Sequence, residues 1–308
     1  MALAASLSTA AYCALDSVSG GDDRIAEEAK LVAPDEPQGG TVSSDPVIDS
    51  RLNVGVAHIA RVYNYWLGGK DHFAADRIAG EATIAVYPGI QMSARANRAF
   101  LARVVRHLAQ AEDIRQFLDI GTGLPTASNT HEVAQAAAPD SRVVYVDNDP
   151  LVLAHARALL TSSPEGATAY LDADVRDTGR ILDEAAGILD FTQPVAIMLI
   201  AILHYIPGLA EARGIVERLL AAVPPGSFLA VSHAGSDLFP DEFAAFEKNL
   251  NEHLPGDRHV ARLREEVAQF FEGTTLLTPG VVPVSQWRPA TADEAAVPTT
   301  LWGAAGRK

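Results

Sequence analysis

The sequence predicts an α/β protein whose core is a Rossmann-like, doubly wound and mostly parallel sheet of seven strands. Three observations support this. An apolar run ends in a glycine-rich turn at residues 117–123, a second ends at Asp147, and a third ends in acids around Asp174. These acids and Asp119 recur at nearly equal intervals, close to the ~30 residues of a strand-plus-helix unit. Each stands near the carboxyl end of its strand, where open α/β sheets bind ligands.

The remaining elements follow from alternating apolar strand runs and helix-length segments. Strands are expected at 115–120, 142–147, 167–172, 194–200, 226–233, 274–285 and 298–305. Helices are expected at 127–138, 150–160, 178–187, 208–222, 240–253 and 257–272. Only a short polar loop joins the last two strands, too short for a crossover helix. We therefore expect an antiparallel last strand at one edge.

The chain before the sheet reads as two further parts. Residues 1–50 alternate acidic residues with Gly, Ser and Pro and predict a disordered extension. Residues 51–112 predict a helical cap with helices at 56–67, 71–86 and 93–109. Residues 113–308 then form the Rossmann-like domain.

Composition and charge argue against several classes of protein. A formal charge of −15 disfavours nonspecific nucleic-acid binding, which depends on Lys and Arg. No apolar run reaches the ~18 residues that a membrane helix needs. The single cysteine, Cys13, leaves neither an internal disulfide nor a cysteine zinc site, and no spacing of metal ligands is visible. A cytoplasmic protein is the default expectation, and a homodimer is left open.

The glycine loop indicates the kind of ligand. Gly121 and Gly123 allow a sharp turn and a close approach of the ligand to the backbone. Asp147 stands where a carboxylate accepts both hydroxyls of a ribose. A dinucleotide is disfavoured, because Thr126 replaces the third small residue and Pro125 removes an N–H from the phosphate site. S-adenosylmethionine, with a sulfonium and an amino-acid tail in place of phosphates, fits better.

The third acid-rich turn, 172–177, adds an adenine site. Asp174 is placed to accept the exocyclic amine, with Val175 against the ring. Asp172 and Asp177 are better read as loop or helix-capping residues.

A wider set of motifs resembles class I S-adenosylmethionine-dependent methyltransferases, and more narrowly the actinobacterial S-adenosyl methyltransferase family (methyltransferase type 19). The matching segments are 60–73, Asp76-Arg77, Asn97-Arg98, 117–126, 146–150, 173–177, 203–207 and 284–288. Asn64 and His72 depart from the usual family residues. The resemblance implies S-adenosylmethionine as cofactor. It places Asp119, Gly121, Thr122 and Gly123 at the methionine end, Asp147 and Asn148 at the ribose, and Asp174 with Val175 at the adenine.

Substrate and catalytic residues are less clearly marked. The Gly68-Gly69-Lys70 turn is expected to fold over the cofactor as a lid, and nearby Tyr63 and Tyr65 are either core or pocket residues. His204, after the fourth strand, is the candidate general base, because histidine titrates near neutral pH. His233, after the fifth strand, is a second candidate. His253 and His259 are expected on surface helices with no special role.

These features predict a methyltransferase that acts on a small-molecule acceptor, with a role in secondary metabolism. Two alternatives stay open. A SAM-binding sensor or partner subunit without catalysis would carry the same cofactor residues. An NAD-dependent oxidoreductase is disfavoured by Pro125 and Thr126.

Overall fold

The computed structural model describes residues 53–159, 162–254, 256 and 258–308. The chain divides into two compact units, 1–47 and 48–308, and all described residues belong to the second. The extension expected at residues 1–50 therefore lies outside the described residues.

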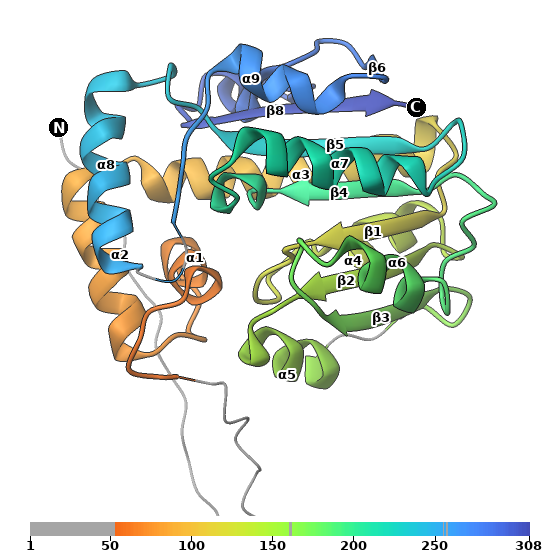
Figure 1. Ribbon diagram of the computed structural model, residues 1–308, viewed down its shortest axis with the longest axis horizontal. Coiled ribbons are helices and arrows are strands. Elements are labelled where there is room, and N and C mark those ends of the chain that lie inside the picture. The colour runs from red at the N-terminus through yellow and green to blue at the C-terminus, as the bar shows by residue number, and fades with distance from the viewer. Residues whose placement is uncertain (1–52, 160–161, 255, 257) are drawn as a thin grey trace, which may run out of the picture. The chain divides into compact units, whose positions relative to one another are not determined.

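A central sheet organises this unit, with strand order β3-β2-β1-β4-β5-β8-β6 and β7 paired to β8 (Figure 1). The strands are β1 Gln116–Ile120, β2 Arg142–Asp147, β3 Ala167–Asp172, β4 Ala196–Ile200, β5 Phe228–Ala234, β6 Thr275–Leu276, β7 Val282–Pro283 and β8 Leu301–Arg307. Strands β1 to β5 pair in parallel, whereas β8 pairs antiparallel with β5, β6 and β7. The Rossmann-like, mostly parallel sheet with an antiparallel last strand is thus confirmed.

Helices cover both faces of the sheet. They are α1 Ile59–Leu67, α2 Ala74–Val86, α3 Ile90–Ala111, α4 Thr130–Ala137, α5 Pro150–Leu159, α6 Thr178–Ala185, α7 Leu209–Ala221, α8 Pro240–His253, α9 Arg264–Ala268 and α10 Ala292–Ala295, with short 3-10 helices η1 Leu203–Tyr205, η2 Gln269–Phe271 and η3 Val284–Gln286. Because side chains alternate along a strand, the buried residues form two clusters. One joins alternate strand residues to α3 and α4, and the other joins the intervening ones to α6 and α7.

Helices α1, α2 and α8 lie beyond the carboxyl ends of the parallel strands (Figure 1). Helix α2 packs against both α1 and α8. Helix α1 ends at Gly68, whose φ of 84° lies in the left-handed region that glycine adopts readily, as the sequence predicts. None of the described helices is long and apolar enough to cross a membrane.

Two C-terminal elements differ from the prediction. The strand expected at 274–285 is two strands of two residues each, β6 and β7, separated by the turn at Pro279-Gly280, where Gly280 has φ 86°. The described sheet accordingly has eight strands rather than seven. Proline lacks the N–H that a continuous ladder needs.

The helix expected at 257–272 is also mostly absent from the described residues, since only α9 and η2 form there. Residues 258–263 are extended instead, and their backbone bonds go to the sheet end. Val260 N donates to the His204 carbonyl (2.8 Å) and Arg262 N to the Ala234 carbonyl (2.9 Å). The Arg262 side chain donates further hydrogen bonds to backbone carbonyls. These bonds would be lost if the segment were a surface helix.

Candidate functional site

A cavity of about 290 Å³ lies at the carboxyl ends of the parallel strands, closed by residues of α1, α3 and α8. All the residues predicted for the cofactor line it: Asp119, Gly121, Thr122, Gly123, Asp147, Asn148, Asp174 and Val175. Tyr63 and His204 also line the cavity, whereas Tyr65, Gly69, Lys70 and His233 do not. The sheet order puts the residues predicted for the adenosine at the ends of β2 and β3, the glycine loop at β1, and the histidines at β4 and β5.

The glycine loop after β1 has the backbone that a closely approaching ligand requires. Gly121 and Gly123 have φ of 74° and 66°, a region costly for residues with a Cβ. A Cβ on Gly121 would lie 2.7 Å from Ile202 Cγ1. A Cβ on Gly123 would meet no atom within 4 Å and would project into open space.

Two buried carboxylates flank this loop. Thr130 Oγ1 donates to Asp119 Oδ2 at 2.5 Å. Burial raises the pKa of Asp119 to about 6, although the Thr130 bond and the Arg98 charge oppose the rise. Asp147 accepts from Gly123 N (2.8 Å) and Asp149 N (3.0 Å), and burial again raises its pKa. Each carboxylate has lone pairs for further donors, so both fit a ligand carrying hydroxyls or an ammonium group.

Asp174, which is predicted to bind the adenine, lies just after β3 and is partly exposed. Its carboxylate accepts from Arg176 N (2.8 Å) and pairs with Arg176 Nη1 (3.2 Å). Val175 beside it is buried and lines the cavity, whereas Asn148 is exposed at the rim. The carboxylate acceptor and the apolar surface predicted for an adenine therefore lie together at this end of the cavity.

Asn97 and Arg98 of α3 also line the cavity, although neither was among the predicted site residues. Asn97 Nδ2 donates to Tyr63 Oη at 3.0 Å, while Asn97 Oδ1 is buried without a partner among the described residues. Arg98 Nη2 donates to the Ser128 carbonyl (3.2 Å) and lies close to Asn129 Oδ1 (3.4 Å), beside the glycine loop. The only sequence signal for this pair is the motif Asn97-Arg98. An unpaired amide oxygen and a guanidinium suit the ammonium and carboxylate of an amino-acid tail.

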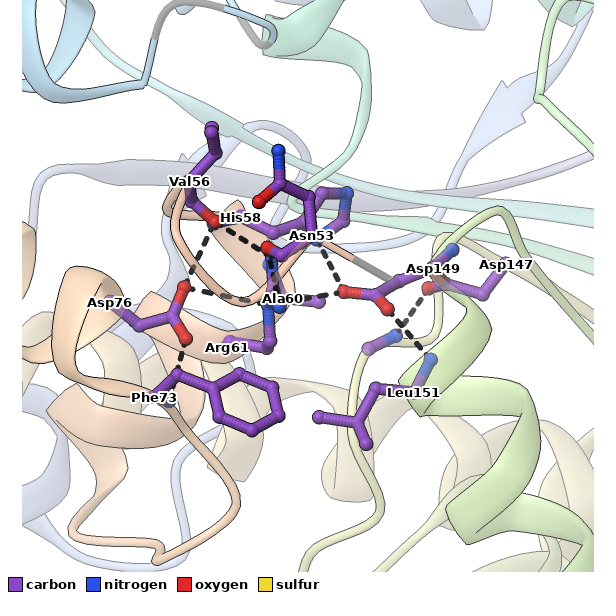
Figure 2. Close-up of polar contacts among 11 residues, drawn as sticks. Asn53, Val56, His58, Ala60, Arg61, Phe73, Asp76, Asp147, Asp149 and Leu151 are labelled. Carbon is purple, nitrogen blue, oxygen red and sulfur yellow. Dashed lines mark hydrogen bonds and ion pairs between the residues drawn. The ribbon is translucent and has the colours of Figure 1, made fainter. Parts of the chain in front are cut away.

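A buried charge network connects α1 and α2 to the loop after β2. Figure 2 shows Arg61 between the two acids: its Nε lies 3.4 Å from Asp76 Oδ1 and 3.5 Å from Asp149 Oδ2. His58 Nδ1 lies 2.8 Å from Asp149 Oδ2. Asp149 N in turn donates to Asp147, so the helical segment is linked to the predicted ribose acid through two residues.

The Gly68-Gly69-Lys70 turn, which was predicted to be the lid, does not line the cavity. Gly69 approaches the Asn64 side chain so closely that a Cβ there would overlap it, and Lys70 is exposed. Tyr65 contacts the His72 ring edge-on (5.1 Å) and Glu81. Trp66, buried one residue further along α1, lines the cavity instead.

Three buried histidines meet at the β4 and β5 side. His204 Nδ1 accepts from Ala234 N at 3.3 Å, and burial lowers the pKa of His204 well below its usual value. His233 lies between the Ala234 carbonyl (2.8 Å) and Arg262 Nη1 (2.6 Å), and burial followed by the Arg262 charge lowers its pKa to about 3. Both rings are thus held neutral.

The third buried histidine is His259, and the prediction that it lies on a surface helix was wrong. It is 3% exposed and lines the cavity rather than a surface helix. Its ring lies 4.7 Å from that of His204, and Nδ1 lies 3.2 Å from Glu247 Oε1. The cause is the extended segment 258–263. Within the described part of the chain, no group of three or more His, Cys, Asp or Glu side chains is arranged to hold a metal ion.

Comparisons with known proteins agree with this geometry. The model of the S-adenosyl methyltransferase family matches residues 46–308. A DUF574-family protein from Streptomyces avermitilis is 45% identical with a TM-score of 0.79, over 82% of this chain and 98% of the other. A protein from Thermobifida fusca, named a candidate methyltransferase, is 41% identical with a TM-score of 0.76, over 82% of this chain and 95% of the other. No curated protein matches the chain.

The family match spans the helices, the sheet and the whole cavity. The glycine cradle, the two buried carboxylates and the unpaired Asn97 oxygen fit the hydroxyls and charged tail of S-adenosylmethionine. The chain therefore belongs to the S-adenosyl methyltransferase family and is an S-adenosylmethionine-dependent methyltransferase.

Proposed function

We propose that this enzyme methylates a small-molecule acceptor inside the cavity. One observation carries the proposal: a single cavity joins the cofactor-type groups at β1 to β3 with the apolar and histidine-lined end at β4 and β5. Its lining at that end includes Phe246, Leu250 and Leu301. An apolar enclosed site with a few polar groups is typical of small-molecule binding.

The cofactor residues follow the sequence prediction with two additions. Asp119, Gly121, Thr122 and Gly123 hold the methionine end, joined by Asn97 and Arg98. Asp147 and Asn148 bind the ribose, and Asp174 with Val175 binds the adenine. When bound, S-adenosylmethionine supplies an electrophilic methyl group on a sulfonium, so the protein's main task is in-line positioning of the acceptor.

Calorimetric titration tests the cofactor assignment. The full chain is titrated in parallel with S-adenosylmethionine, S-adenosylhomocysteine and NAD. We expect binding of the first two and none of NAD. Binding of NAD alone would contradict the proposal. Binding of S-adenosylmethionine without methyl transfer to any acceptor would favour a noncatalytic sensor or partner subunit.

A further inference from the structure

We propose that His259, held by Glu247, is the general base of the acceptor site and that the acceptor carries a hydroxyl group on an apolar framework. The inference rests on the proposed function and deepens it. Neither residue belongs to the predicted site, and both come from the C-terminal part of the chain.

The position of His259 is fixed by its backbone. Asn251 holds that backbone from both sides, since its Oδ1 accepts from His259 N (2.7 Å) and its Nδ2 donates to the His259 carbonyl (3.0 Å). The next residue, Val260, is bonded to the His204 carbonyl (2.8 Å). Arg262 then fastens the segment through the carbonyls of Leu203 (3.0 Å) and Ile206 (2.6 Å). A base must be held in place before its substrate arrives, and these bonds do so.

The Glu247 carboxylate sets the proton on the ring. Glu247 Oε1 lies 3.2 Å from His259 Nδ1 and also accepts from Ala261 N at 2.6 Å, which orients the carboxylate. A carboxylate only accepts, so Nδ1 carries the hydrogen and Nε2 carries the lone pair. This is the arrangement in which a carboxylate orients a histidine base and stabilises the cation that it forms.

The neighbouring histidines are unsuited to that role. The backbone N–H of Ala234 occupies the lone pair of His204 Nδ1, so the ring hydrogen is on Nε2 and that nitrogen can only donate. His233 has both nitrogens engaged, by the Ala234 carbonyl and by Arg262, and does not line the cavity. His204 is therefore a positioning donor rather than the predicted base.

Burial keeps the His259 ring neutral and able to accept a proton, by lowering its pKa. Burial lowers the pKa of His259, the bond and charge of Glu247 raise it, and Arg262 lowers it. His204 and His233 face it as neutral rings, and Arg258 acts on Glu247. A buried imidazole that is neutral near pH 7 and paired with a carboxylate is a competent base.

The surroundings indicate the acceptor. The His259 ring meets the rings of Phe246 (5.8 Å) and Tyr205 (5.6 Å), and Leu250 and Leu301 complete an apolar wall. A neutral amine attacks a methyl group through its own lone pair and does not need a base beforehand. A hydroxyl is a weak nucleophile until its proton leaves, so a held base at this position indicates an alcohol or phenol.

The proposed methyl transfer to the acceptor hydroxyl conserves atoms and charge. The acceptor O–H proton passes to His259 Nε2 as the oxygen forms a bond to the methyl carbon. The carbon–sulfur bond breaks, and S-adenosylhomocysteine leaves with that electron pair. The imidazolium, paired with Glu247, then releases its proton to solvent. The products are the methyl ether, S-adenosylhomocysteine and one proton.

The first test needs no methyl transfer. Ring-nitrogen NMR of the full chain with S-adenosylhomocysteine should show the hydrogen of His259 on Nδ1 and that of His204 on Nε2. Glu247→Gln should lower the pKa of His259, because the raising charge is lost, while its amide oxygen can still accept from Ala261. Glu252→Gln, on the exposed part of the same helix, should change neither ring. A His259 ring protonated on Nε2 would overturn the proposal.

The second test identifies the nucleophile. Naphthol, naphthylamine and naphthalenethiol share one apolar framework, and an isotope-labelled methyl group reports by its carbon shift which atom receives it. We expect the O-methyl product, a loss of roughly 100-fold or more in kcat for His259→Gln, and no loss for His253→Gln. In Glu247→Gln the acid limb of the kcat profile should move to lower pH.

Label on nitrogen or sulfur, or none on any of the three, would overturn the hydroxyl assignment. Unchanged kcat in His259→Gln would overturn the base. Failure of S-adenosylhomocysteine to bind would instead contradict the proposed function, so the two failures are distinct.

Discussion

At the scale of the residue, Asp147 carries the ribose assignment. Asp147→Asn keeps an amide oxygen for the Gly123 N–H but loses the charge that accepts two hydroxyls. Hydrogen bonds to charged groups are worth about 1.5–3 kcal/mol, so the Kd for S-adenosylmethionine should rise by roughly 10- to 100-fold. Calorimetry measures it, with exposed Asp183→Asn as the control. Unchanged affinity in a folded variant would show that the ribose lies elsewhere.

Arg98 leads to a different prediction, because it lines the cavity beside the glycine loop, where the methionine end of the cofactor is proposed to bind. Arg98→Met should weaken S-adenosylhomocysteine but leave methylthioadenosine, which lacks the amino-acid tail, unaffected. The exposed neighbour Arg95→Met on the same helix should alter neither. Equal weakening of both ligands would indicate that Arg98 supports the loop rather than the carboxylate.

At the scale of the element, the Arg61 network connects α1 and α2 to the loop after β2 (Figure 2). Arg61 is 4% exposed and Asp76 is fully buried, so removing the cation leaves two buried carboxylates that keep His58 and their backbone N–H donors but lose the guanidinium between them. Breaking a buried pair costs about 3–5 kcal/mol. Arg61→Met should lower the free energy of unfolding by that order and also weaken cofactor binding through Asp149 and Asp147.

Denaturant unfolding and calorimetry on one preparation test both effects. Arg77→Met, at a half-exposed site on α2, should change the free energy of unfolding by less than about 1 kcal/mol. Loss of stability with unchanged cofactor affinity would show that the network stabilises the packing of α1 and α2 but does not affect cofactor binding.

At the scale of the element, the sequence predicts some parts of the fold and misses others. Strands β1 to β5 are largely apolar runs, and β1, β2 and β3 carry an acid at or next to their last residue, so pattern alone located them, and with them the predicted cofactor residues. The segment around His259 could not be found this way. Its extended path depends on bonds from Arg262 and Glu247 to distant carbonyls and N–H groups, and no local propensity encodes partners that the fold brings together. The Pro279-Gly280 turn, by contrast, was visible and should have divided the expected strand.

At the scale of the whole molecule, burying the charge of Asp119, a predicted cofactor residue, lowers the stability of the fold at neutral pH. Burial raises the pKa of Asp119 from 3.8 to about 6, so the folded chain binds this proton more tightly than the unfolded chain. The stabilising contribution of protonation is fully present below pH 4 and is lost as pH rises through about 6. At pH 7 the buried charge therefore costs about 3 kcal/mol, at 1.36 kcal/mol per pKa unit.

Asp119→Asn should remove this cost, since its amide oxygen still accepts from Thr130. The variant should be more stable than the parent at pH 7 by about 1–3 kcal/mol, and the difference should shrink as pH falls from 6 to 4. It should also bind S-adenosylmethionine more weakly, because the tail's ammonium loses its carboxylate. Denaturant unfolding across this pH range measures the first effect, with exposed Asp183→Asn as the control. A variant less stable than the parent at pH 7 would show that the surroundings compensate the Asp119 charge. Burying this carboxylate would then not lower the free energy of unfolding.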